Sequence, residues 1–247
     1  MGKKVTKPVI IAVTALILLV IAFMMRGSLR GPARVVLPEE IESSGEMHTG
    51  GENEAIDRID IRPSTVQAAI ATLSRPQEYS RTLRIERYYS GGSAVEEAEV
   101  FVRGAWTRTD LTGPNGETRH VITGGGKSRI WYGSSRRWYE GAALLSADEE
   151  QSIPTYEDVL LLDTTSIALA DYRMLDSKDC IYVATAADSG GYVERYWVSL
   201  EDGLLVAAEK SCGDEVVYRM AGLTVSTEGV KDDAFTLPDG TVLNTAE

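Results

Sequence analysis

Residues 180 to 225 read CIYVATAADSGGYVERYWVSLEDGLLVAAEKSCGDEVVYRMAGLTV, and this stretch predicts four successive β-strands. β-Branched and aromatic residues recur within each strand, and turns rich in Gly, Asp and Ser separate the strands. Turns this short join antiparallel neighbours. The segment therefore indicates an antiparallel meander, with strands expected at Cys180–Ala187, Tyr192–Leu200, Leu204–Ser211 and Glu215–Val225.

The same two-residue period extends upstream of this meander. Alternate residues from Tyr79 to Tyr89 share one strand face, and the pair Gly91-Gly92 ends that strand. In the segment RIWYGSSRRWYEG, a two-residue loop at Ser134-Ser135 pairs Trp131 with Trp138 and places both indoles on one face. Further strands are expected at 100–108, 118–123, 128–132 and 137–140.

Short helices are expected at two places between the strands. Apolar residues at helical spacing in TVQAAIATLSRP predict an amphipathic helix that ends before Pro76. Pro154 opens a second helix, which runs to Leu162 with acids in its first turn, and the following TTSIALADYR adds another turn or two. The expected fold is mainly β (α+β), a strongly curved antiparallel sheet or incomplete barrel covered by two or three helices.

The N-terminal segment decides the expected location. Residues 8–25 contain no charged side chain and would span roughly 27 Å as a helix, close to the thickness of a bilayer core. We expect a transmembrane signal-anchor with residues 1–7 in the cytoplasm, an acidic and largely disordered tether at 26–62, and an exported domain at 63–247. The protein would be a single-pass protein of the cell membrane. A cleaved signal peptide is the alternative, although no clean cleavage site follows the apolar run.

The charge balance narrows the possible partners. The six basic residues up to Arg34 come without acids, which leaves 19 basic and 37 acidic residues after it, a formal charge of −18. Such a domain repels phosphate backbones and anionic lipid headgroups. We therefore expect no nucleic-acid binding, and membrane attachment only through the N-terminal helix.

Known catalytic and metal-binding patterns are missing from the sequence. His48 lies in the tether and His120 in a strand, without HExxH, GxSxG or Cys-His spacing. Gly124-Gly125-Gly126 lacks the Lys-Ser/Thr ending of a phosphate-binding loop and suits a hairpin turn. Adjacent acids such as 96–97, 148–150 and 232–233 are expected to be solvated rather than catalytic. The expectation is a protein that is not an enzyme and uses no metal or cofactor.

The two cysteines of an exported domain raise the question of a disulfide. In the expected meander, Cys180 lies opposite about Ser199 and Cys212 opposite about Tyr192. The two would then be at opposite ends of strands two apart, beyond the Cα separation of about 7 Å that a disulfide allows. A bulge or a different strand order would change this result, so the pairing of Cys180 with Cys212 remains an alternative.

Three segments, taken in order, resemble the LolA/LolB/RseB superfamily of exported lipoprotein-binding and sensor domains. They are HVITGGGKSRIWYGSSRRWYEG, RYWVSLEDGLLVAAEKSCGDEVVYRMAGLTVS and DDAFTLPDGTVL. The resemblance as a whole extends over about 63–243. The resemblance implies a strongly curved antiparallel sheet. Within the superfamily, the closest functional analogue is the GerS-like branch of spore-forming clostridia, in which the domain is a partner of a cell-wall amidase. A cell-wall or spore-envelope role follows from that analogy.

The resemblance also implies a ligand cavity on the concave face, for acyl chains or an apolar peptide. The aromatic residues expected to line that cavity are Trp106, Trp131, Trp138, Tyr132 and Tyr139. Alternatively these side chains fill the core between sheet and helices, which is the interpretation favoured for Trp197. Two functions stay open: a module that engages an envelope protein in a regulatory or sensor role, and a carrier of lipid or lipoprotein. The tether favours a local protein partner.

Overall fold

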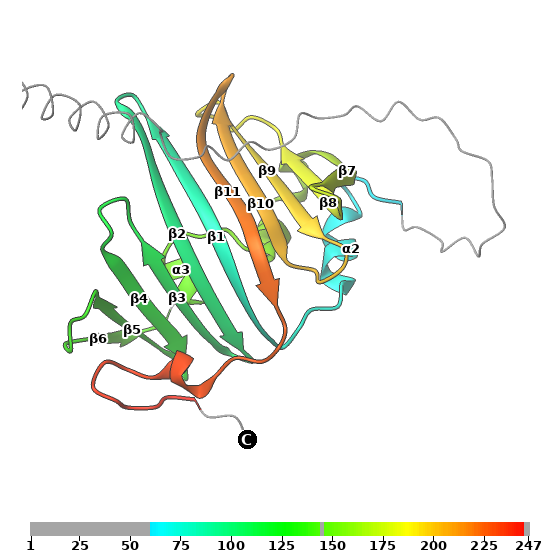
Figure 1. Cartoon of the computed structure of the whole chain (residues 1–247). Helices are drawn as coiled ribbons and strands as arrows, with labels where there is room; N and C mark the ends of the chain where they lie inside the picture. Colours follow the sequence, from blue (N-terminus) through cyan, green and yellow to red (C-terminus); the bar gives the residue numbers. More distant parts are fainter. Residues whose placement is uncertain (1–59, 144–145, 245–247) are drawn as a thin grey trace, which may run out of the picture. The chain divides into compact units, whose positions relative to one another are not determined.

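The computed structural model describes residues 60–143 and 146–244. Within these ranges, eleven strands form one antiparallel sheet in the spatial order β6-β5-β4-β3-β2-β1-β11-β10-β9-β8-β7 (Figure 1). Strands β1 to β6 form one meander and β7 to β11 form the other, and the pairing of β1 with β11 joins the two. The expected curved and open antiparallel sheet with few helices is confirmed.

The strands have these bounds: β1 (Glu78–Tyr89), β2 (Gly92–Arg103), β3 (Trp106–Thr112), β4 (Thr118–Gly124), β5 (Lys127–Tyr132), β6 (Tyr139–Ala142), β7 (Ile167–Leu175), β8 (Lys178–Thr185), β9 (Tyr192–Ser199), β10 (Leu205–Cys212) and β11 (Glu215–Ser226). The helices are α2 (Val66–Thr72), α3 (Ala147–Glu150) and α4 (Tyr156–Leu161), with the 3-10 helices η1 (Thr164–Ser166) and η2 (Asp232–Phe235).

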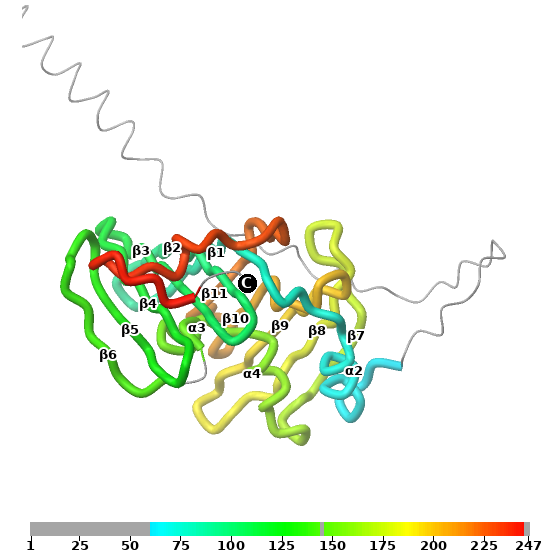
Figure 2. Tube along the Cα trace, turned by 90° about the horizontal axis from the view of Figure 1, so that it is seen from below, coloured from blue at the N-terminus to red at the C-terminus, as the bar shows by residue number. Residues whose placement is uncertain are grey.

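Helices α2, α3 and α4 lie within the curve of the sheet (Figure 2). We call this concave side the helix-covered face. Helix α2 forms where the sequence predicts it, and it buries Val66, Ala69 and Ile70. Helix α4 begins with a capping box in which Thr155 and Asp158 satisfy each other's backbone amides.

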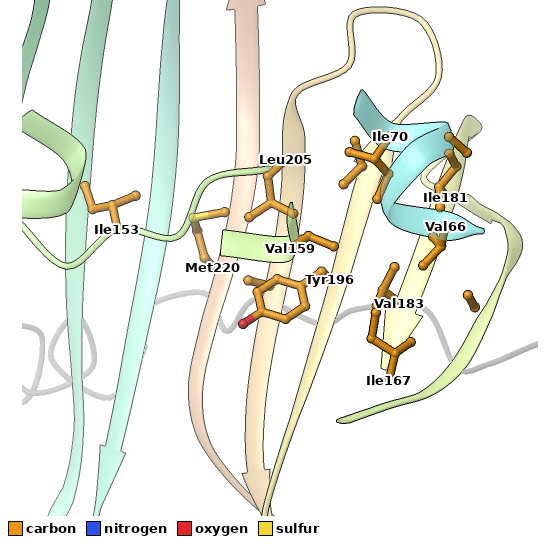
Figure 3. Packing of buried hydrophobic residues seen from close by; sticks show 14 of the residues in the cluster. Val66, Ile70, Ile153, Val159, Ile167, Ile181, Val183, Tyr196, Leu205 and Met220 are labelled. Carbon is orange, nitrogen blue, oxygen red and sulfur yellow. The ribbon is translucent and has the colours of Figure 1, made fainter. Parts of the chain in front are cut away.

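The main hydrophobic core lies between the helices and this face of the sheet (Figure 3). The strand register aligns Leu83 with Ala98 on β2, and Ile85 with Met220 on β11. These side chains are buried together with Ile70 of α2 and other residues of the helices. Burying one large aliphatic side chain of this kind contributes about 1.5–3 kcal/mol, so α2 and α4 are held mainly by the apolar residues that they insert.

A second core lies on the opposite face of the sheet. Alternation along the strands places Trp106, Ile122 and Trp131 there, because their neighbours in sequence point toward the helices. Residues 230–243, which we call the C-terminal strap, cover these side chains (Figure 1). Phe235 of the strap is fully buried, and Arg108 donates a hydrogen bond of 2.8 Å to the Ala234 carbonyl.

The hairpin registers agree with the sequence prediction. Cys180 lies opposite Ser199, and Cys212 lies opposite Tyr192. Both cysteines are free, so the alternative of a disulfide between them is wrong for this fold. Tyr139 pairs with Ile130 in the antiparallel hairpin of β5 and β6. The same register aligns Trp131 with Trp138.

Four expectations about local structure need correction. The single strand expected at 100–108 is two strands, because a turn at Gly104, which has positive φ, ends β2 and reverses the chain into β3. Residues 167–175 form strand β7 and not a continuation of the helix, because pairing with β8 outweighs the helix propensity of Ala and Leu in this segment. The short helix α3 was not expected. Helix α4 is capped by Thr155, so Pro154 precedes the cap and is not in the first turn.

The N-terminal part of the prediction is outside the described residues. The expected anchor at 8–25 and the tether up to residue 59 belong to that part of the chain. Among the residues that the structure describes, no helix is long and apolar enough to cross a bilayer. Ile61, which the sequence places in the tether, packs against the main core.

The close contact between Gly124 and Trp106 gives a test of the second core. A Cβ atom added at Gly124 would lie 2.2 Å from the indole ring, whereas one added at Gly141 of edge strand β6 meets nothing within 4 Å. Gly124→Ala should therefore lower the free energy of unfolding by about 1–3 kcal/mol. Gly141→Ala should change it by less than about 0.5 kcal/mol. Urea unfolding measures both changes. Equal free energies of unfolding for the two variants would contradict the close contact between Gly124 and Trp106.

The cysteines give a second test. Cys180 is buried, and burial raises the pKa of its thiol to about 11, whereas Cys212 is partly exposed. Iodoacetamide at pH 8 should alkylate Cys212 in the folded protein and both thiols in urea, as peptide mass spectrometry would report. If neither thiol were alkylated in urea until a reductant was added, the two cysteines would not be free.

Candidate ligand cleft on the helix-covered face

Two adjoining cavities open between the helices and the concave side of the sheet. The first has a volume of about 320 Å³ and the second about 560 Å³. Ser146, Thr155 and Glu157 line both, so the cavities adjoin beside α3 and α4, and we call the two together the cleft. A cleft of this size is large enough to enclose several side chains or a small ligand.

Local sequence positions the two helices at the cleft. The Ser146 hydroxyl accepts a hydrogen bond from the Glu149 amide at 3.2 Å and caps α3. The Thr155 amide donates to the Asp158 carboxylate at 2.7 Å and so fixes the first turn of α4. The segment between these caps contains Ile153, which is 2% exposed and anchors the connection in the core.

A buried ion pair forms the floor of the first cavity. Arg81 Nη2 lies 3.1 Å from Asp148 Oδ2, and both side chains are less than a tenth exposed. Asp148 Oδ1 also accepts a hydrogen bond of 2.8 Å from the Thr109 hydroxyl, and Arg81 Nη1 donates to the Leu205 carbonyl at 3.1 Å. Within the described part of the chain, Arg81 Nε has no hydrogen-bond partner.

Arg75 forms the wall at the other end of the first cavity. Its guanidinium stacks on the Tyr156 ring at 3.6 Å and donates to the carbonyls of Ile70, Leu73 and Gly203. These bonds satisfy backbone acceptors at the end of α2. Burial raises the pKa of the nearby Tyr79 phenol to about 12, so this group stays neutral at physiological pH.

The second cavity combines carboxylates with apolar side chains. Its acidic lining residues are Glu149, Glu157, Asp158 and Glu194, and its larger apolar ones are Ile153, Leu161, Leu162 and Tyr196. No Lys, Arg or His is among the described residues that line it. Burial raises the pKa of Asp158, and the surrounding carboxylates raise it further against the opposing hydrogen bond from the Thr155 amide.

Glu194 is held in place at the edge of the second cavity. The Tyr196 hydroxyl donates to Glu194 Oε2 at 2.8 Å, and Lys210 Nζ donates to Oε1 at 2.8 Å. Leu161 lies at the same cavity with 73% of its surface exposed. The second cavity thus presents fixed negative charge next to an uncovered apolar side chain.

The predicted aromatic site is not assembled on the concave face. Trp106, Trp131 and Trp138 pack against the opposite side of the sheet, with Phe235 of the C-terminal strap. The Trp138 indole donates a hydrogen bond of 3.1 Å to Asp239 in that strap. Their expected location is therefore wrong, because alternation along a strand assigns residues to two faces without saying which face the helices cover.

Tyr132 and Tyr139 lie apart from the three tryptophans. Strand pairing places them on the same side of the sheet as the helices, near its β6 edge, where they are 47% and 68% exposed. Neither lines the two cavities. Binding of a ligand by any of these five aromatic residues stays a prediction. Trp197 is buried against Tyr182, as a core residue would be, but on the face opposite the helices and not between sheet and helices as expected.

The remaining sequence candidates have structural contacts. His120 stacks on Trp131 with 4.9 Å between ring centroids, and its Nδ1 lies 2.9 Å from Asp110 Oδ1. Gly125 and Gly126 adopt positive φ in the turn between β4 and β5, as a hairpin requires. In the described ranges, no group of three or more His, Cys, Asp or Glu side chains is arranged to hold a metal ion.

Sequence reasoning missed the residues that build the cleft. Asp148 was expected among solvated acids, but it is 3% exposed and pairs with Arg81. The pattern Ser146-Ala147-Asp148-Glu149 is an N-terminal helix signal that could have revealed α3. Nothing in the sequence indicates the partner strand, because Arg81 and Asp148 are distant along the chain.

Comparison with known proteins finds similarity among solved structures alone. No family model matches the chain, and no curated protein sequence does. Similar solved structures include MucB in complex with MucA(peri), at 14% identity and a TM-score of 0.41, where the match covers 68% of this chain and 57% of the MucB chain. The present chain thus spans less than two thirds of MucB.

Two further neighbours are matched over nearly their whole length. A LolA superfamily protein from Nitrosomonas europaea has 10% identity and a TM-score of 0.35, with 72% of this chain and 98% of that chain covered. The Mycobacterium tuberculosis lipoprotein LppX has 12% identity and a TM-score of 0.37, with 66% and 92% covered. The solved structures that are similar to this chain thus include a protein of the LolA superfamily, which is part of the superfamily that the sequence motifs resemble. The relation to the GerS-like branch stays a prediction.

The buried ion pair at the floor of the cleft can be tested directly. Asp148→Asn leaves the Arg81 guanidinium buried without a counter-charge, which should lower the free energy of unfolding by about 3–5 kcal/mol. Asp214→Asn, in the exposed turn before β11, removes the same charge and should change it by less than about 0.5 kcal/mol. Urea unfolding compares the two. Equal stabilities of the two variants would mean that the ion pair between Arg81 and Asp148 contributes nothing to the free energy of unfolding.

Proposed function

We propose that this chain is a membrane-tethered, extracytoplasmic binding module that engages a protein of the cell envelope through the cleft on its helix-covered face. The observation that carries the proposal is the second cavity, where carboxylates and apolar side chains line one opening. A regulatory or sensor role suits a module that holds its partner without changing it. The LolA-like fold is compatible with such a role but does not select the partner.

The proposed location rests on the N-terminal sequence. An apolar stretch at 8–25, followed by an acidic segment, suits an uncleaved anchor with the domain outside the cytoplasm. A flexible tether of roughly 35 residues has a typical reach of about 30–35 Å. A domain held this close to its membrane meets local partners more readily than it transports a cargo between membranes.

The lining of the cleft supports a protein partner over an anionic lipid. A lipid headgroup that carries phosphate would meet the carboxylates of Glu149, Glu157 and Asp158 at the second cavity. Acyl chains would in addition have to cover ionised groups without hydrogen bonds to them, which is costly. A polypeptide can supply both polar and apolar groups over the same short distance.

The proposal that the chain is not an enzyme rests on how three of the five carboxylates that line the cleft are used. Asp148 is bound to Arg81 and Thr109, and Asp158 caps α4. Glu194 accepts hydrogen bonds from Tyr196 and Lys210. Acids that are occupied in this way stabilise the structure and are poor general bases.

A carrier of lipid or lipoprotein is the second candidate function. Leu161 is 73% exposed at the cleft, next to the partly buried Leu162. An acyl chain could cover both residues if its headgroup stayed outside the acidic cavity.

Photo-crosslinking in the native envelope distinguishes the two candidates. A photoreactive amino acid at Leu161 of the full chain should form adducts with a defined envelope protein, identified by mass spectrometry. The same amino acid at Val242, exposed on the C-terminal strap, serves as the control and should not form those adducts. Adducts with lipid alone at Leu161 would favour the carrier, and identical adducts at both positions would contradict a role for the cleft.

A further inference from the structure

We propose that the edge hairpin, which consists of β5, β6 and the loop 133–138 between them, contacts the anionic phospholipid surface of the membrane to which the chain is tethered. This inference rests on the membrane-tethered location in the proposed function, and it assigns the side of the domain that faces the bilayer. Three features of the edge hairpin support it: its local charge, two exposed arginines and two exposed tyrosines.

The charge at this edge of the sheet is opposite to that of the domain. Residues 118–142, which include β4, β5 and β6, contain five basic residues and one acid, a formal charge of +4. The chain after Arg34 carries −18 in total, and that total is the reason for expecting no contact between the domain and anionic lipid. At physiological ionic strength, charges on the distant strands are screened within about 8 Å. An anionic surface can therefore attract this edge although it repels the rest of the domain.

Arg136 and Arg137 supply the charge excess of the edge hairpin. Both side chains are exposed, and neither forms an ion pair or a side-chain hydrogen bond with another residue of the described ranges. The other basic residues of the hairpin share its one acid, because Lys127 and Arg129 both pair with Glu140. A guanidinium binds phosphate oxygens through paired N–H donors. Two such arginines in one short loop therefore suit phospholipid headgroups.

The loop presents its arginines in an ordered conformation. The Ser135 hydroxyl accepts a hydrogen bond of 3.1 Å from the Arg137 amide. Asp239 of the C-terminal strap contacts the loop, but this carboxylate is already engaged. It accepts hydrogen bonds from the Trp138 indole at 3.1 Å and from the Thr241 amide at 2.9 Å. A loop that is fixed in this way loses little conformational entropy when it binds a surface.

Two exposed tyrosines flank the arginines. Tyr132 ends β5 and is 47% exposed, and Tyr139 begins β6 and is 68% exposed. Strand pairing places both on the same side of the sheet, at its outer edge (Figure 1). Tyrosine is enriched at membrane–water interfaces, because its ring is apolar and its hydroxyl group is polar. The edge hairpin thus combines phosphate-binding side chains with side chains that suit the bilayer interface.

The tether allows a weak contact to be populated. A domain held within about 30–35 Å of a bilayer meets it at an effective concentration in roughly the millimolar range. Each basic residue close to an anionic surface strengthens binding about fivefold. Two arginines and two tyrosines are therefore sufficient to orient the domain, and no high-affinity site is needed.

The acidic tether of the chain itself is a less suitable occupant. Residue 60, where the described domain begins, leads into α2, and α2 packs against β8. Strand β8 and the edge hairpin lie near opposite ends of the sheet (Figure 2). The acids of the tether would have to cross the sheet to reach Arg136 and Arg137, whereas a flat lipid surface can meet an exposed edge directly.

Photo-crosslinking tests the contact. A photoreactive amino acid replaces Tyr139 in the full chain, which is placed in nanodiscs of phosphatidylcholine that contain about one third phosphatidylglycerol. The control position is Met174, which is 70% exposed on β7 at the opposite edge of the sheet. Position 139 should yield at least about fivefold more lipid adduct than position 174, as measured by mass spectrometry. The yield at position 139 should fall about threefold or more in pure phosphatidylcholine and at high salt.

Matched variants locate the effect in the loop. Arg136→Gln combined with Arg137→Gln should lower the lipid adduct at position 139 about three- to tenfold in the nanodiscs that contain phosphatidylglycerol. Lys178→Gln combined with Lys231→Gln removes the same charge from exposed sites outside residues 118–142 and should leave the yield within about twofold. Circular dichroism confirms that the variants are folded.

Several results would overturn the inference. These are equal lipid adduct at positions 139 and 174, equal effects of the two variant pairs, and a yield that does not depend on phosphatidylglycerol. Adducts of position 139 with the acidic tether alone would also overturn it, and they would assign the edge hairpin to a contact within the chain. Each result leaves the proposed function standing if Leu161 still forms adducts with an envelope protein. A chain that nanodiscs do not retain would instead remove the tethered location, and the inference with it.

Discussion

The antiparallel pairing of β1 with β11 is the constraint on which the rest of this structure depends. It joins residues as far apart in sequence as Ser80 and Ser226 and turns two separate meanders into one sheet. Arg81 is on the central strand β1, where it reaches both the Leu205 carbonyl of one meander and Asp148 of α3. The position of α3, and with it the floor of the cleft, follows from this junction.

An open sheet of this size has two faces, and both must be covered. The concave face receives α2, α3 and α4. Helices α2 and α4 insert apolar side chains into the main core, and α3 places Asp148 against Arg81. The opposite face receives the C-terminal strap, with Phe235 packed near Trp106. The three helices are short, and beside α3 and α4 they leave part of the concave face open as the cleft. A solvent-accessible site is thus a consequence of incomplete covering.

The hairpins show how far sequence reasoning reaches. The positions of Cys180 opposite Ser199 and of Cys212 opposite Tyr192 follow from strand period and turn length, which are properties of neighbouring residues. Strand β7 was misassigned because IALADYRML has good helix formers, and only its distant pairing with β8 decides between the two structures. The aromatic residues were grouped correctly for Trp131 and Trp138, but they were placed on the wrong face.

The sequence by itself determined most of the strands and turns, helix α2 and the acidic character of the domain, because these depend on local periodicity and composition; it missed β7 and the turn between β2 and β3. Only the tertiary structure decided which face the helices cover, that Asp148 is buried with Arg81, and that four acids meet beside Leu161. The physical reason is that a two-residue alternation is symmetric between the two faces of a strand. The choice between the faces comes from packing among residues that are far apart in the chain.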